Sequence, residues 1–179
     1  MQRFFLRLSY DFSIETEYIS FRFLPPSGYA QGVVRHEGNS YSIVMPTGFD
    51  FGNPRHMLWA NVVLKNTLRE QARRVVAPRL RQLAAEYGLA FNRVYIKDVV
   101  SRWGSCSSAR NINISLWLLL APTHLVDYVL KHELAHLSEM NHSARFWAEA
   151  DRMTGGAGTA KRLENEMKAF ARTLQRLWL

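Results

Sequence analysis

The sequence predicts an α+β fold, and three observations support this prediction. Turn residues separate strand-like segments over residues 14–46, a long helical pattern follows them, and a strongly apolar helix carries HELAH at residues 132–136. Strands therefore come first, a long helix second and a helix with chemically reactive side chains third. With 179 residues, 47% of them hydrophobic, the chain can bury the core of one domain.

We expect that domain to span residues 1–179, with a β region at 1–52, a long helical region at 53–90 and a catalytic core with a C-terminal helix at 91–179. Turn residues between the first strands predict a three-stranded antiparallel meander. Pro78 predicts a break or kink in the long helix. The expected strands are 14–24, 31–36, 41–46, 92–99 and 112–114, and the expected helices are 53–87, 122–136, 143–153 and 160–177.

The HELAH segment has the spacing of a metal site. On a helix, positions i and i+4 lie on one face, so the imidazoles of His132 and His136 can converge on one ion. Glu133 can then take a proton from a metal-activated water. A catalytic zinc ion takes three protein ligands and keeps one open position, and His142 is the obvious third ligand.

Two alternatives remain open at this site. The third ligand could be a downstream carboxylate, for which Glu139 and Glu149 are the candidates. The two histidines and Glu133 could instead form a buried hydrogen-bonded cluster without metal. We prefer the metal site, because polar groups in so apolar a helix are costly to bury unless they are satisfied.

Several motifs in one order make the chain resemble a known family. From residue 101 to about residue 153 it resembles the YgjP-like metallopeptidases, a bacterial and archaeal group related to the SprT-like zinc proteases. The matching segments are SRWGSCS at 101–107, NINI at 111–114, YVLKHELAHL at 128–137, NHS at 141–143 and FW at 146–147. The histidine spacing also equals that of the metzincins, but Glu139 stands where those enzymes have glycine, which argues against membership.

The resemblance implies a compact, zincin-like α+β metallopeptidase that binds Zn²⁺ through His132, His136 and His142 and uses Glu133 as general base. It also makes the strand around Asn113 a candidate for the edge strand that binds extended peptide, with a purely structural strand as the alternative. In the RWGS turn, Arg102 could stabilise an oxyanion or bind a carboxylate or phosphate. Trp103 more simply fills the core.

The basic composition suggests a polyanionic partner. The formal net charge is +8, and Lys65, Arg69 and Arg73 fall on one stripe of the long helix. Against a nucleic-acid site, Glu70 interrupts the stripe, and charged helix faces are commonly only solvated. We therefore expect peptide or protein as the substrate and at most weak association with nucleic acid through the basic surface.

Cysteine content and hydropathy indicate the cellular compartment in which the protein is expected. Cys106 is the single cysteine, so no intramolecular disulfide can form, and a reducing compartment is the natural inference. Residues 1–7 break their apolar run too early for a secretion signal, and the apolar run at 116–122 is far shorter than the roughly 20 residues that cross a bilayer. We expect a cytoplasmic monomer without membrane contact.

The leading hypothesis is a zinc-dependent metallopeptidase. The alternative is a metal-dependent phosphoanhydride hydrolase acting on a nucleoside triphosphate, because basic residues around a Lewis-acidic ion could also hold phosphates. It ranks second since such sites usually add carboxylate ligands. A catalytically idle, zinc-stabilised binding module ranks third, because structural zinc sites are usually closed and rich in cysteine.

Overall fold

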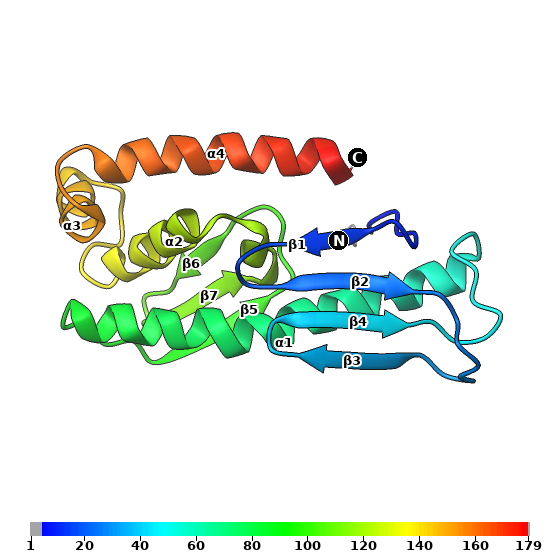
Figure 1. Cartoon of the computed structure of the whole chain (residues 1–179). Coiled ribbons are helices and arrows are strands. Elements are labelled where there is room, and N and C mark those ends of the chain that lie inside the picture. The colour runs from blue at the N-terminus through cyan, green and yellow to red at the C-terminus, as the bar shows by residue number, and fades with distance from the viewer. Residues whose placement is uncertain (1–4, 179) are drawn as a thin grey trace. The chain divides into compact units, whose positions relative to one another are not determined.

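The computed structural model describes residues 5–178, with side chains up to residue 174, so the amino-terminal stretch considered above lies partly outside the described residues. The chain forms two compact units, Met1–Gln71 and Ala72–Leu179, which are described separately below. The single domain that the sequence predicts stays a prediction. The predicted α+β class is confirmed, because both strands and helices build the described chain (Figure 1).

The first unit contains a four-stranded sheet. Its strands are β1 (Ser13–Glu15), β2 (Ser20–Leu24), β3 (Val33–Glu37) and β4 (Ser40–Val44). They lie in the order β1-β2-β4-β3 (Figure 1). β2 and β4 run parallel, while β1–β2 and β3–β4 are antiparallel. The predicted antiparallel meander is therefore right for the β3–β4 pair and wrong for β2, which lies beside β4 and runs parallel to it.

Local chemistry explains the difference. The predicted strand at 14–24 is divided by a turn in which the Thr16 hydroxyl accepts hydrogen bonds from the backbone N–H groups of Tyr18 and Ile19. Pro25 and Pro26 then follow β2 and cannot donate backbone hydrogen bonds, so no tight hairpin joins β2 to β3. Instead β3 and β4 form their own hairpin, and β4 pairs with β2 in parallel.

The long helix α1 (Pro54–Glu86) contributes its first part to one unit and its last part to the other. It continues through Pro78, so the predicted break does not occur. One proline removes a single backbone hydrogen bond, whereas buried side chains hold the helix before and after it. Leu68 in the first unit and Leu80 in the second are both fully buried.

The second unit contains a three-stranded sheet, in the order β5-β7-β6. β5 (Arg93–Lys97) pairs in parallel with β7 (Asn111–Ser115), and β6 (Gly104–Cys106) pairs antiparallel with it. The sequence suggests only a turn where β6 lies. Asn113 is in the central strand β7, with partners on both sides, so the expectation that it belongs to an edge strand beside the site is wrong.

The helices of this unit follow the sheet. The 3-10 helix η1 (Leu116–Leu120) leads into α2 (Thr123–Ala135), and α3 (Ala144–Thr154) and α4 (Thr159–Trp178) come after it (Figure 1). Arg79 of α1 forms a bidentate ion pair with Asp127 of α2. The carboxylate of Asp151 accepts hydrogen bonds from the backbone N–H groups of Gly158, just before α4, and Ala160, in its first turn, and so fixes the glycine-rich connection. No helix in the described part of the chain combines the length and apolar character needed to cross a membrane.

Candidate active site

α2 is a short helix buried along most of its circumference. Pro122 stands at its N-cap position, where it offers no side-chain cap, and Thr123 is the first helical residue. Leu125, Leu130 and Leu134 are almost completely buried, so the helix is held by packing rather than by surface charge. It ends at Ala135, which frees the following residues to turn away, as predicted.

Three imidazoles converge beyond the end of this helix. One ring nitrogen from each of His132, His136 and His142 lies within 4.8 Å of the other two. Nε2 of His132 is 3.1 Å from Nε2 of His142. Two nitrogens bound to a tetrahedral zinc ion at their usual bond lengths lie about 3.3 Å apart, so this spacing suits a shared ion.

The outer nitrogens of two rings are held by hydrogen bonds. Nδ1 of His136 lies 3.1 Å from the backbone carbonyl oxygen of Glu139, an acceptor only, so this nitrogen carries the proton. The lone pair of His136 is then on Nε2, where a metal ligand needs it. Nδ1 of His132 lies 3.3 Å from the hydroxyl oxygen of Tyr128, one helical turn earlier. The donor set therefore fits a metal ion.

His142 is placed by the start of α3. The Ser143 side chain caps that helix by accepting the backbone N–H of Phe146. The Phe146 ring, itself fully buried, lies 4.5–4.9 Å from the imidazoles of all three histidines, and Trp147 stacks on His142 at 5.9 Å. These aromatic contacts pack against all three rings and restrict their positions.

The two competing carboxylates do not join the three rings. Glu139 contributes its backbone oxygen to His136, and the Glu149 carboxylate pairs with Arg152. Among the described residues, the group able to hold an ion consists of the three histidines alone. The structure thus favours His142 over either glutamate as the third member of the group.

Glu133 is buried beneath strand β6. Its side chain is 5% exposed, and Oε2 has no hydrogen-bond partner among the described residues. Burial raises the pKa of Glu133 to about 8, against an opposing effect from the positive charge of Arg102. A buried oxygen without a partner is costly in a merely structural role, and it is available to bind a water or a proton.

His132 and His136 are held neutral by their surroundings. Burial, with the neighbouring His136 and His142, lowers the pKa of His132 from 6.5 to about 4. Burial also lowers the pKa of His136. Neutral imidazoles are what a metal ion requires, so His132 and His136 do not have to lose protons near neutral pH to bind one.

Sequence reasoning missed Gly104 and Tyr128. Gly104 belongs to the predicted RWGS turn, and in the structure a β-carbon added to it would lie 2.5 Å from Oε1 of Glu133. No local pattern gives this contact, since it joins segments far apart in the chain. Tyr128 could have been found, because it precedes His132 by four residues on the same helix and so lies directly beneath it.

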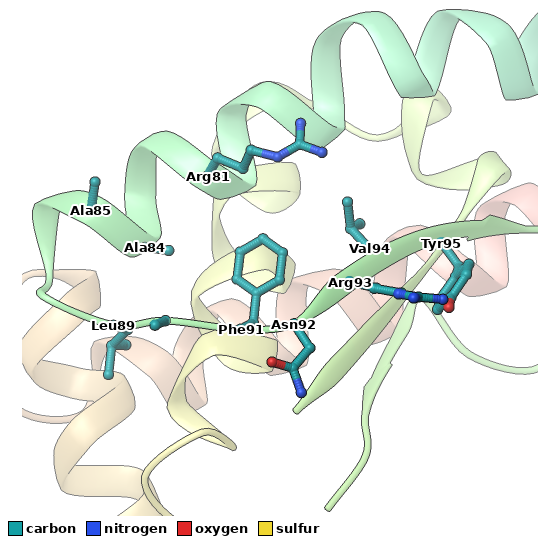
Figure 2. A pocket seen from close by; sticks show the side chains of 10 residues that line it. Arg81, Ala84, Ala85, Leu89, Phe91, Asn92, Arg93, Val94 and Tyr95 are labelled. Carbon is teal, nitrogen blue, oxygen red and sulfur yellow. The ribbon is translucent and has the colours of Figure 1, made fainter. Parts of the chain in front are cut away.

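A hollow elsewhere in the second unit lacks metal-binding and acid–base side chains. It has a volume of about 460 Å³ and lies between the end of α1 and β5, with Phe91 pointing into it (Figure 2). None of its lining residues is a histidine, cysteine, aspartate or glutamate. It therefore offers neither metal ligands nor a general base, and the candidate active site is the histidine group.

A family model describes most of the chain. The model of the YgjP-like metallopeptidase domain matches residues 47–168. The chain belongs to the YgjP-like metallopeptidase family. The resemblance noted in the sequence is thus confirmed and extends over α1 as well as the active-site helix. The YgjP-like chain is accordingly a metallopeptidase, a class that requires a divalent metal, and its histidine group can supply the ligands.

Two solved structures are similar to this YgjP-like chain. The metallopeptidase zymogen abylysin of Pyrococcus abyssi is 26% identical, with a TM-score of 0.48, over 59% of this chain and 100% of its own. The metallopeptidase zymogen jannalysin of Methanocaldococcus jannaschii is 17% identical, with a TM-score of 0.45, over 52% of this chain and 94% of its own. A comparison with curated proteins found no match.

Proposed function

We propose that the YgjP-like chain is a zinc-dependent peptidase in which His132, His136 and His142 bind the ion and Glu133 is the general base. The observation that carries this proposal is the convergence of three imidazoles next to a buried glutamate whose Oε2 has no hydrogen-bond partner among the described residues. Three nitrogen ligands leave one position of a tetrahedral ion open, as in catalytic zinc sites.

The proton transfers follow from the position of Glu133. A zinc ion bound to the histidines would polarise the scissile carbonyl and lower the pKa of its water to about 7. Oε2 of Glu133, which has no other described partner, takes the proton from the attacking water and delivers it to the leaving amine. The positive charge of a zinc ion held by the histidines would favour the carboxylate form of Glu133 that this step needs, against the effect of burial.

Strand β6 is the candidate edge for binding an extended peptide. In the described part of the chain it pairs only with β7. The carbonyl of Trp103 and the N–H of Ser107 bond to β7, so by strand alternation the backbone groups of Gly104 and Cys106 face the open edge. A peptide added there gains hydrogen bonds regardless of its side chains. Gly104 touches Glu133, so such a peptide would pass beside the general base.

The test combines metal analysis with turnover. Purified protein is loaded with zinc, analysed for metal and offered casein and nucleoside triphosphates, beside Glu133→Gln. We expect close to one zinc per chain in both proteins and peptide cleavage by the wild type only. Cleavage by the variant would remove Glu133 from the mechanism. Glu133-dependent hydrolysis of the triphosphate alone would replace the peptidase by the phosphoanhydride hydrolase that the sequence leaves as the alternative.

A further inference from the structure

A small basic hollow lies at the end of the second unit's sheet. Its volume is about 310 Å³, and its lining includes Lys97, Ser101, Arg102, Ser105 and Asn113. We propose that this hollow binds the carboxylate of an aspartate or glutamate side chain in the substrate, next to the scissile bond. The inference rests on the proposed peptidase function and names a preference for acidic peptides.

The hollow is lined by two cations, Lys97 and Arg102, and by no acidic side chain. Neither cation forms an ion pair with a described side chain; the ammonium group of Lys97 lies over the ring of Tyr95 instead. A guanidinium can bind a carboxylate through two parallel hydrogen bonds, and Arg102 has its donors available for this.

Neutral donors complete the lining. The side-chain amide of Asn113 donates to the hydroxyl of Ser105 at 3.2 Å. Because the oxygen of Ser105 already accepts this bond, its own O–H is left to donate to a ligand. The hollow therefore offers donors of both kinds, charged and neutral, as an anion requires.

The hollow adjoins the general base across strand β6. Gly104 lines it, and a β-carbon on Gly104 would point at Glu133. Successive side chains of a strand point to opposite faces, so Ser105 points away from Glu133, to the face where it lines the hollow. Arg102 is close enough for its charge to oppose the rise in the pKa of Glu133 that burial causes.

A peptide bound along β6 would place its side chains on both faces of the sheet. Its side chains alternate between the face with Glu133 and the histidines and the face with Ser105 and the hollow. A residue adjacent to the one beside Glu133 would then extend its side chain toward Arg102. One carboxylate suits one guanidinium and one ammonium group, and a volume of about 310 Å³ has room for a glutamate side chain.

The experiment compares three peptides that differ at one position, Glu, Gln or Lys, with zinc-loaded full-length protein. In the wild type, kcat/KM for the Glu peptide should exceed that for the Gln peptide by about fivefold, the size expected for an exposed charge pair. Arg102→Gln should bring this ratio closer to one, because only Lys97 then remains as a cation in the lining, and Arg102→Glu should lower it further and raise the relative cleavage of the Lys peptide. The ratio cancels any effect of Arg102 on Glu133, since that effect is common to all peptides.

Arg93→Gln is the matched control, because Arg93 is an exposed cation on β5 that does not line the hollow. It should keep the wild-type ratio. Equal cleavage of all three peptides by the wild type, or the same ratio in Arg102→Gln, overturns the proposal.

A binding experiment tests this proposal independently of the peptidase function. Fluorescence anisotropy of the labelled Glu and Gln peptides is measured on zinc-loaded Glu133→Gln with and without Arg102→Gln. Preference for the Glu peptide that depends on Arg102, without cleavage by the wild type, would support the hollow while the peptidase function fails. No preference in binding, with Arg102-dependent binding of ATP instead, would overturn the carboxylate assignment.

Discussion

Gly104 and Glu133 lie in direct contact, with the strand backbone pressed against the carboxylate side chain. A β-carbon added at Gly104 would lie 2.5 Å from Oε1 and 2.6 Å from Cγ of Glu133. The Cγ atom cannot swing away without moving the whole side chain, so only glycine leaves room for the general base at this point.

Gly104→Ala should therefore displace Glu133 and lower kcat by about a hundredfold, as misplacement of a catalytic group by about 1 Å can do. Overpacking should also cost about 1–3 kcal/mol of unfolding free energy. Steady-state peptide cleavage and urea unfolding measure the two effects. The same substitution in a Glu133→Ala background should cost much less stability, because the obstructing side chain is gone. An equal cost in both backgrounds would show that the contact with Glu133 is not the reason for the glycine.

His142→Ala should lower zinc affinity by more than about a hundredfold, since losing a direct ligand exceeds the loss of an outer hydrogen bond. Competition with a chromophoric chelator measures this affinity. His124→Ala is the matched control, because His124 pairs with Glu166 outside the group of three histidines. Equal affinity in the His142 variant and the wild type would exclude His142 as a ligand.

Tyr128→Phe should lower zinc affinity by about 10- to 100-fold, because it removes the hydroxyl that lies against Nδ1 of His132 and orients its ring. The same chelator competition serves as the assay. Tyr87→Phe removes a comparable hydroxyl, which donates to the carbonyl of Met153, and should leave zinc affinity unchanged. If both variants bind zinc alike, Tyr128 does not position the ligand.

The metal-free protein should lose stability as the pH rises from 6.5 to 8. Burial raises the pKa of Glu133 from 4.5 to about 8, so the folded chain holds an extra proton in this window and the free energy of unfolding falls as pH rises. The lowered pKa values of His132 and His136 act in the opposite direction, but only below about 6.5.

Urea unfolding in EDTA should show a loss of about 1–2 kcal/mol between these pH values in the wild type that Glu133→Gln lacks. The variant carries a neutral amide of similar shape, which makes it the control for this comparison. Parallel pH profiles for the two proteins would contradict the raised pKa of Glu133.

Sequence patterns predict where the strands lie but not how they pair. Each predicted strand region contains a strand, but the parallel pairing of β2 with β4 was not predicted. Apolar alternation records which face of a strand is buried and not which neighbour it has. For the same reason the sequence predicts only a turn at β6, since glycine, serine and cysteine show no apolar alternation.

By itself the sequence determined the local part of the site: the helix α2, the convergence of His132 and His136, and the capped start of α3 that follows His142. These features depend on residues within about one or two turns of each other, where helix geometry fixes which side chains meet. Only the tertiary structure decided that Gly104 covers Glu133, that β6 forms an open edge and that Arg102 and Lys97 line one hollow. Those contacts join segments that the chain brings together through packing of its sheet and helices, and no local pattern specifies that packing.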